Sequence, residues 1–432
     1  MKFAIRSLFN SSRFASSNIA TLSVAQVSGV LIATLAGMGV WYLVALLAPP
    51  AEVGILGKVI STSIFIASVV TAGLGQFYLT VIRSTSVTRL RRYFWLGLIL
   101  GSVIAGIAAI AIGTLQSGGV NQVAISTGLL CIGVAITNLQ DSLYLGTGLA
   151  IDVPAKSAAI LIFRLFLLLG LASFNLDLFA FLFIFVISQL IIGVGWVLIR
   201  APLALARHAS RMIENSQENN LGITLTVSYL YALAITAVTM GVPALVTSLS
   251  LPATAGEFYL AWILAGLLGS IAIAIANSVL ALSIGQNQPA RRLTRILFSL
   301  AGIMLLGSLF ISILLPSVVV RLDQHYREIP ALFRMLSAGN IFFGITLVLL
   351  AAYRTFTIHR QLVLILVAWP LVIAVSVLLG LLTGDIEAGA MGFVISAGFT
   401  AVPICILTYR TLLKSDHKIS NTLAEAIDRS IL

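Results

Sequence analysis

Charged side chains are scarce in this chain of 432 residues. Lysine, arginine, aspartate and glutamate make up only 9% of it, whereas apolar residues make up 59%. A soluble domain carries about 25% charged and about 45–50% apolar residues. The apolar residues gather in blocks long enough to cross a hydrocarbon core of about 30 Å as helices. The composition therefore excludes a soluble domain and predicts an all-α, polytopic membrane protein.

Sequence motifs for disulfide, metal or nucleotide chemistry are also lacking. The 2 cysteines, Cys131 and Cys405, lie inside apolar blocks, where we interpret them as small packing residues. The 4 histidines follow no metal-binding spacing such as H-E-x-x-H, and no G-x-x-x-x-G-K-[ST] phosphate-binding loop occurs. We therefore expect no metal, no cofactor and no ATPase activity.

Twelve apolar blocks predict twelve membrane-spanning helices. They cover about residues 19–47, 53–81, 94–115, 122–150, 155–174, 177–199, 221–249, 257–285, 295–318, 329–352, 361–383 and 388–409. No signal-peptide cleavage site follows the basic N-terminal segment, so we interpret the first span as retained. A polar cytoplasmic linker at 206–220 separates an N-terminal six-helix bundle, residues 1–205, from a C-terminal six-helix bundle with a cytoplasmic tail, residues 221–432.

Lysine and arginine are unevenly distributed between the predicted loops. One side holds 20 of the 25, Lys156 and Arg354 among them, and the other side has only Arg321 and Arg327. That second side carries seven acids, including Glu257. Positively charged loops stay in the cytoplasm, so both termini are predicted to be cytoplasmic. The net charge of +11 reflects this bias. Because it is spread over many loops, it does not indicate nucleic-acid binding.

Two short segments suggest an internal repeat. "PPAEVGILG" and "LPATAGEFY" align without a gap, so that Pro50 falls on Pro252 and Gly54 on Gly256, an offset of 202 residues. Six predicted spans separate them, and an even number places both turns on the same side of the membrane. The halves are then parallel repeats related by a pseudo-two-fold axis along the membrane normal.

Two further alignments support the repeat. The polar pair Gly75-Gln76 falls on Asn277-Ser278 at the same offset of 202 residues. "LGTGLAIDVPAK" at 145–156 resembles "LLAAYRTFTIHR" at 349–360, with an offset of 204. We expect both segments to end corresponding spans, the fourth and the tenth.

Longer segments of both halves resemble a known family. "EVGILGKVISTSIFIASVVTAGLGQFYLTVIR" is similar to the start of polysaccharide and O-antigen flippases of the Wzx type. These belong to the multidrug/oligosaccharidyl-lipid/polysaccharide exporter (MOP) superfamily. "LPSVVVRLDQHYREIPALFRMLSAGNIFFGITLVLLAAYRTF" looks like the family's ninth-to-tenth span region. The chain departs from the family near the end of span eight, where "NSVLALSIGQNQPARR" has no proline before Pro289.

The resemblance implies both an architecture and a function. Two six-helix bundles would enclose a cavity that opens alternately to either side of a bacterial inner membrane. The cargo would be a lipid-linked oligosaccharide, an O-antigen or exopolysaccharide repeat unit on a polyprenyl pyrophosphate. It would move from the inner to the outer leaflet. The partners implied are membrane lipids, a polysaccharide polymerase and a chain-length regulator, and the protein would be a monomer.

Charges inside spans are costly in lipid and are therefore candidates for function. Asp141 and Arg164 each lie eleven or twelve residues from a turn expected at 152–153. At a rise of 1.5 Å per residue, both would be about 17 Å deep on neighbouring antiparallel helices. We expect them to face each other. They form either a structural ion pair or a site in which Arg164 meets an anionic head group while Asp141 tunes it.

Three other cations are weaker candidates. Lys58 and Arg334 lie about five residues inside the predicted outer ends of their spans, in opposite halves. They either snorkel to the interface or line a cationic path for the pyrophosphate. Arg83, at the cytoplasmic end of span two, either contacts the head group at entry or follows the positive-inside rule.

Neutral polar side chains occur in several spans and suit recognition of a glycan. The cavity candidates are Gln26, Gln76, Asn277 and Asn340. A hydrogen bond between helices, at about 0.6 kcal/mol, is the favoured explanation for any one of them alone. Several together favour a cavity, above all Gln76 and Asn277 at matching positions.

Two other functions compete with the flippase. A multidrug or cation antiporter of the same superfamily needs buried acids, and Asp141 is the single acid that we place deep in a span. A membrane polysaccharide polymerase would carry a long outer loop with clustered charges. This chain offers only "RLDQHYRE" for such a loop, so we expect a transporter rather than an enzyme.

Overall fold

The computed structural model is helical throughout its described part. It describes residues 36–81, 86–117, 119–147, 149, 151–174, 176–209, 221–282, 289–319, 326–356 and 360–431, and no strand occurs among them. The helices are α2 (Pro50–Val81), α3 (Val87–Ser117), α4 (Gln122–Thr147), α5 (Asp152–Leu171), α6 (Leu178–Ala209), α7 (Leu221–Thr236), η1 (Ala237–Gly241), α8 (Val242–Leu249), α9 (Pro252–Leu282), α10 (Pro289–Val319), α11 (Ile329–Phe356), α12 (Arg360–Thr383) and α13 (Ile386–Ile431).

The described helices confirm the predicted all-α membrane fold. Eleven described segments are long and apolar enough to cross a membrane, and a further apolar helix is described over Ala36–Leu47. The eleven correspond to the predicted second to twelfth spans, with η1 joining α7 and α8 into the seventh. The predicted first span, 19–47, begins outside the described residues, as does most of the linker.

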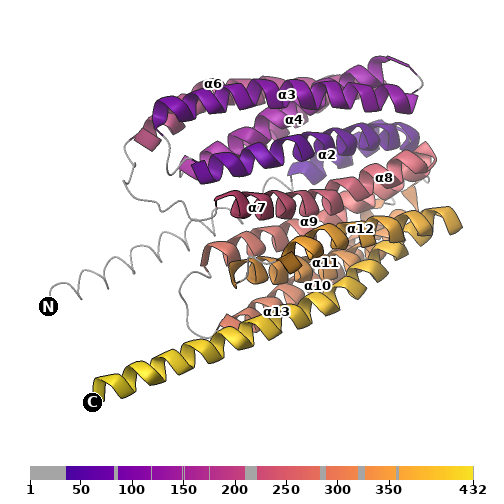
Figure 1. Cartoon of the computed structure of the whole chain (residues 1–432). Helices are drawn as coiled ribbons and strands as arrows, with labels where there is room; N and C mark the ends of the chain where they lie inside the picture. Colours follow the sequence, from indigo (N-terminus) through magenta and orange to yellow (C-terminus); the bar gives the residue numbers. More distant parts are fainter. Residues whose placement is uncertain are drawn as a thin grey trace.

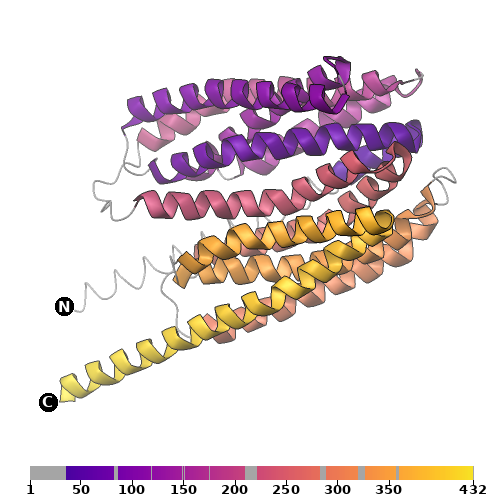
Figure 2. The ribbon, with the colours of Figure 1, turned by 45° about the vertical axis from the view of Figure 1, so that its right-hand side comes forward.

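The helices form two groups that lie side by side along the bundle. Figure 1 shows α3, α4 and α6 on one side and α10, α11 and α13 on the other, with α2, α7 and α9 between them. Figure 2 shows the same layering from a second direction. A continuous apolar core runs through both groups, from Val40 and Leu56 to Phe333 and Trp369. The cores therefore meet where α2 packs on α9.

The helix boundaries confirm the offset of 202 residues for the first helices of each repeat and correct the offset proposed for the later ones. α2 and α9 begin at Pro50 and Pro252, 202 residues apart, and both ends of α3 and α10 keep that offset. α11 begins 207 residues after α4, at 329 against 122. The reason is that the segment between α10 and α11 is longer than the one between α3 and α4. The offset of 204 proposed for 145–156 and 349–360 is therefore wrong.

The two proline-glycine segments pack directly on each other. We call the end of the bundle at which Pro50 and Pro252 lie the proline end, and the opposite end the linker end. A Cβ atom added to Gly54 would lie 1.9 Å from the carbonyl oxygen of Pro252. One added to Gly256 would lie 2.2 Å from that of Pro50. Only glycine permits such a backbone approach. The repeated glycines therefore join the two halves at this end.

A one-turn π-helix, η1, interrupts the seventh span just before a proline. Pro243 has no N–H group to donate to the carbonyl of Thr239, four residues earlier. The indole Nε1 of Trp262 on α9 donates to that carbonyl instead, at 3.1 Å. The freed backbone group is thus satisfied within the protein, as a chain in lipid requires.

Candidate substrate-binding site

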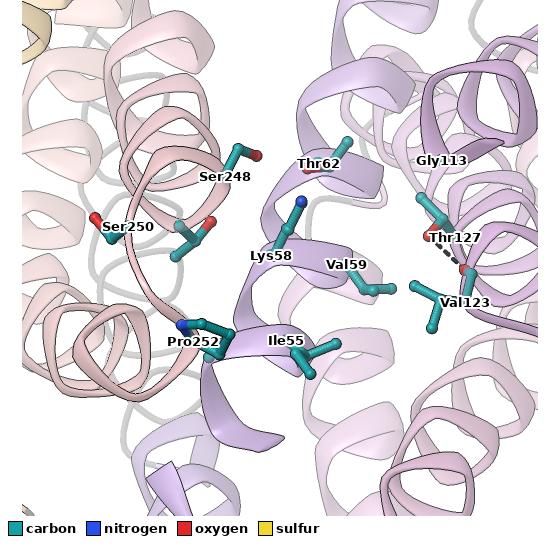
Figure 3. Close-up of a pocket in the computed structure, with 12 residues that line it drawn as sticks. Ile55, Lys58, Val59, Thr62, Gly113, Val123, Thr127, Ser248, Ser250 and Pro252 are labelled. Atoms are coloured by element: carbon teal, nitrogen blue, oxygen red, sulfur yellow. Dashed lines mark hydrogen bonds between the residues drawn. The ribbon is translucent and has the colours of Figure 1, made fainter. Parts of the chain in front are cut away.

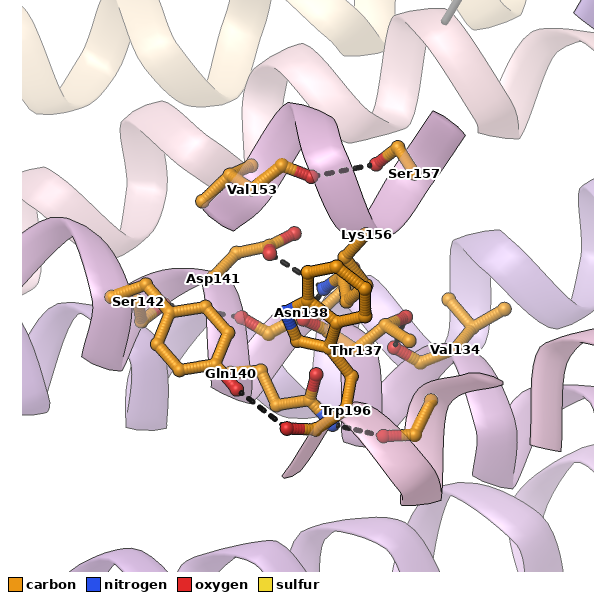
Figure 4. Close-up of polar contacts among 12 residues, drawn as sticks. Val134, Thr137, Asn138, Gln140, Asp141, Ser142, Val153, Lys156, Ser157 and Trp196 are labelled. Carbon is orange, nitrogen blue, oxygen red and sulfur yellow. Dashed lines mark hydrogen bonds and ion pairs between the residues drawn. The ribbon is translucent and has the colours of Figure 1, made fainter. Parts of the chain in front are cut away.

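Asp141 pairs with Lys156 rather than with Arg164. The Nζ atom of Lys156 lies 2.5 Å from Oδ1 of Asp141 and donates to the carbonyl of Thr137 at 2.7 Å. Figure 4 shows this pair between α4 and α5. The Lys156 side chain is 1% exposed and that of Asp141 is 29% exposed. The expected pairing of Asp141 with Arg164 was therefore wrong.

The physical reason lies in the position of the turn. α4 ends at Thr147 and α5 begins at Asp152, so the turn precedes the position assumed from the sequence. Asp141 then lies about 9 Å from the turn and Arg164 about 18 Å, because each helical residue rises 1.5 Å. Lys156, which we had placed in a cytoplasmic loop, is inside α5 and level with Asp141.

Neutral polar residues around this pair tie α4 to its neighbours. Gln189 of α6 donates to the hydroxyl of Thr137 at 3.0 Å, and Gln140 donates to the carbonyl of Gly193 at 2.7 Å. Asn138 donates to Ser68 of α2 at 3.3 Å. These contacts connect α2, α4 and α6 as interhelical hydrogen bonds do elsewhere in membranes. The network therefore holds the ion pair in a fixed position.

Arg164 occupies a separate, aromatic environment. It is 8% exposed, and its Nε atom donates to the hydroxyl of Ser188 on α6 at 3.1 Å. Its guanidinium carbon lies 4.0 Å from the centroid of the Phe185 ring, within the range of a cation–π interaction. Trp41 continues the aromatic cluster, with its ring 5.4 Å from Phe185 and 4.8 Å from Tyr259.

The positive charge of Arg164 has no carboxylate partner in the described part of the chain. Asp141 pairs with Lys156 and Asp152 with Arg200 instead. Residues 1–51, which include the whole predicted first span, contain neither aspartate nor glutamate and supply no carboxylate. A buried cation of this kind is expensive in lipid and marks a candidate anion site.

Lys58 lines a small cavity at the proline end. The cavity has a volume of about 160 Å³ and lies between α2, α4 and α8. Figure 3 shows the Lys58 amine directed between Thr62 and Ser248. The hydroxyl of Thr62 is buried and has no hydrogen-bond partner among the described residues. The lining includes three more hydroxyl residues and no acid: Thr127, Thr247 and Ser250.

The other predicted residues do not join these sites within the described structure. Asn340 is buried, and its amide donates to the carbonyl of Leu336 one turn earlier at 3.0 Å. Arg334 is exposed on α11. Gln76 and Asn277 lie on α2 and α9 at the expected offset of 202, but their side chains are outside the described atoms. Gln26 and Arg83 lie outside the described residues.

The structure places two further charged residues inside helices rather than in loops. Arg354, which we had placed in a cytoplasmic loop, ends α11, donates to the Ser228 hydroxyl and lies 5.3 Å from the Tyr231 ring. Glu257, which we had placed in an outer loop, lies in the second turn of α9 and is 8% exposed. Both were misplaced because the helices extend several residues beyond their apolar blocks.

The comparisons with known proteins identify a fold and no family. No family model matches the chain, and no curated protein matches it. Among solved structures it resembles "MATE multidrug transporter DinF-BH in complex with R6G". The TM-score is 0.64 and the identity 13%, over 91% of this chain and 96% of that one.

Two further structures show the same likeness. The inward-facing conformation of a multidrug resistance MATE transporter of the MOP superfamily gives a TM-score of 0.63. The identity is 13%, over 91% of this chain and 99% of that chain. A MOP superfamily transporter from Pyrococcus furiosus, described as having a binding pocket of reverse polarity, gives 0.58 at 15% identity. That match covers 91% of this chain and 95% of the other. The chain thus has the two-lobe, all-helical fold of MATE-like membrane transporters.

Proposed function

We propose that the protein is a flippase for polyprenyl-pyrophosphate-linked oligosaccharides. It moves an O-antigen or exopolysaccharide repeat unit from the inner to the outer leaflet of a bacterial inner membrane by alternating access. The pyrophosphate and sugars need a polar path through the protein, whereas the polyprenyl tail can stay in lipid.

The observation that carries this proposal is how charged side chains inside the bundle are paired. The acid inside α4, Asp141, is neutralised by Lys156 at 2.5 Å. Arg164 is buried without a carboxylate partner in the described part of the chain, and Lys58 lines a cavity that contains no acid. Uncompensated cations attract an anionic cargo and repel a cationic one, which favours a pyrophosphate over a cationic drug.

Alternating access is supported by the contact at the proline end. Gly54 and Gly256 close the two halves on each other there through backbone contact. The chain is also more similar to the inward-facing MATE structure, with a TM-score of 0.63, than to the outward-facing one, with 0.57. We interpret the structure as the state that is closed at the proline end, which is the outer end in the predicted orientation.

Multidrug or cation antiport remains the second candidate, and one observation favours it. Glu257 is a buried carboxylate near the proline end of α9, and an antiporter for cations needs acids inside its spans. The neighbour that was solved with R6G shares the fold. Unlike the flippase, this function predicts that drug tolerance, and not the glycan, changes when the gene is removed.

The decisive experiment deletes the gene and analyses the polyprenyl-linked glycans of each leaflet. A flippase predicts that the complete repeat unit accumulates on the cytoplasmic side. Normal delivery to the outer leaflet with unpolymerised units would point to a polymerase. Unchanged glycans with altered drug tolerance would point to the antiporter.

Arg164→Gln tests the role of the buried cation. A hydrogen bond to a charged group contributes about 1.5–3 kcal/mol, so loss of the contact to the pyrophosphate should slow transport about 10- to 150-fold. Arg92→Gln removes an exposed charge from α3 and should leave transport unchanged. The yield of monodisperse protein is measured for both variants, because a purely structural Arg164 would lower the yield together with transport.

A further inference from the structure

An apolar groove runs along the side of the bundle where the two halves meet. It has a volume of about 630 Å³ and is walled by α2, α7, η1, α8 and α12, with Ile112 of α3 at one edge. Its lining on the seventh span extends from Leu230 to Ser248. That is about 25 Å along a helix, close to the thickness of a hydrocarbon core. The groove is therefore long enough to hold a single extended lipid chain.

The groove opens towards the surface that faces lipid. Leu371 of α12 lines it and is 56% exposed, and Val367, one turn earlier, is 44% exposed. On its inner side the groove reaches small residues such as Ala237 and Ala374, which leave space for a ligand. A hydrocarbon chain can thus enter sideways from the membrane without crossing a polar barrier.

At the proline end the groove adjoins the Lys58 cavity. Thr62 and Ser248 line both spaces, so an amphiphile can occupy them together. The buried hydroxyl of Thr62, which has no partner among the described residues, lies at the junction. The Lys58 amine lies beside it. A cation and free hydroxyl donors at one end of an apolar groove complement a phosphate attached to a long hydrocarbon chain.

We propose that this combined site binds a polyprenyl phosphate, with the phosphate at Lys58, Thr62 and Ser248 and the polyprenyl chain in the groove. The inference rests on the proposed function and names the place where the lipid part of its cargo is held, near the proline end. The sugars then extend from the cavity rather than from the groove. Lys58 repels a cationic amphiphile from the same position.

The test measures binding of a polyprenyl monophosphate to the purified full-length protein in detergent micelles. Lys58→Gln should weaken binding at least tenfold, because it removes the charge that faces the phosphate. Ala374→Phe fills the groove and should weaken binding similarly. Two matched controls should bind as the wild type does: Arg92→Gln, and Val375→Phe at the neighbouring, 51% exposed position of α12.

The outcomes separate the parts of the proposal. Equal binding by Lys58→Gln and wild type overturns the phosphate site, and equal binding by Ala374→Phe overturns the groove. Competition by phosphatidylglycerol, added to the same detergent micelles at the same concentration, also overturns the proposed polyprenyl phosphate site. The site would then hold ordinary membrane lipid. The glycan analysis reports separately on transport, so a bound polyprenyl phosphate with unchanged glycans would reject the proposed function and keep the binding site.

Discussion

The Asp141–Lys156 pair should respond asymmetrically to removal of either partner. Asp141→Asn leaves a lysine that is 1% exposed with only the Thr137 carbonyl as a partner. Breaking a buried ion pair in this way costs about 3–5 kcal/mol of unfolding free energy. Lys156→Met leaves a carboxylate that is 29% exposed and can reach water or take up a proton. We expect that variant to lose about 1–3 kcal/mol.

The double variant isolates the interaction itself. Asp141→Asn with Lys156→Met removes both charges, so it should be more stable than the sum of the single losses predicts, by about 1.5–3 kcal/mol. Reversible unfolding in mixed micelles measures all four free energies. Asp141→Asn combined with Arg164→Gln is the matched control. It should be additive within about 0.5 kcal/mol, because Arg164 contacts Ser188 and Phe185 instead.

Three results would refute this reasoning. Additive losses for Asp141 and Lys156 would mean that the two side chains do not interact in the membrane protein. Coupling between Asp141 and Arg164 above about 1 kcal/mol would restore the pairing expected from the sequence. A larger loss for Lys156→Met than for Asp141→Asn would contradict the burial of Lys156.

Two further predictions concern the contact between the halves and the packing of α9 on the seventh span. Gly54→Val should abolish the state closed at the proline end, because its Cβ atom would lie 1.9 Å from the Pro252 carbonyl oxygen. Spin labels placed across that end should report a wider separation between the halves. Gly195→Val is the control and should not change that separation, because the added Cβ atom meets nothing within 4 Å. Trp262→Phe removes the donor to the Thr239 carbonyl and should lower the unfolding free energy by about 1–3 kcal/mol. The backbone amides of α7 and α8 should then exchange hydrogen faster. Unchanged exchange there would contradict the role of Trp262 as the donor to this carbonyl.

Much of the fold follows from hydropathy alone, because a bilayer demands long apolar helices. The turn segments at Pro50 and Pro252 also kept their common offset in the structure. The side-chain partners were harder to predict. A shift of a few residues in the turn after Thr147 exchanged Arg164 for Lys156 as the partner of Asp141. No pattern within one helix reveals such a register.

The surroundings of Arg164 depend on helices that are distant in the sequence. Ser188 and Phe185 come from α6, and Tyr259 comes from α9 in the other half of the chain. A sequence pattern predicts which residues share a helix face, but not which face of a second helix meets it. Lys58 was identified as a candidate, yet the groove beside it joins α2 to α7, η1, α8 and α12, and the α2 sequence alone does not reveal those partners.

The contact of Gly54 with Gly256 also bears on the free energy that holds the two halves together at the proline end. The two helices meet there through backbone atoms rather than side chains, so separating them at this point loses only weak dispersion forces. A contact of this kind is close and yet needs little free energy to open. It depends equally on one glycine from each half, so substitution of either glycine should disturb it in the same way.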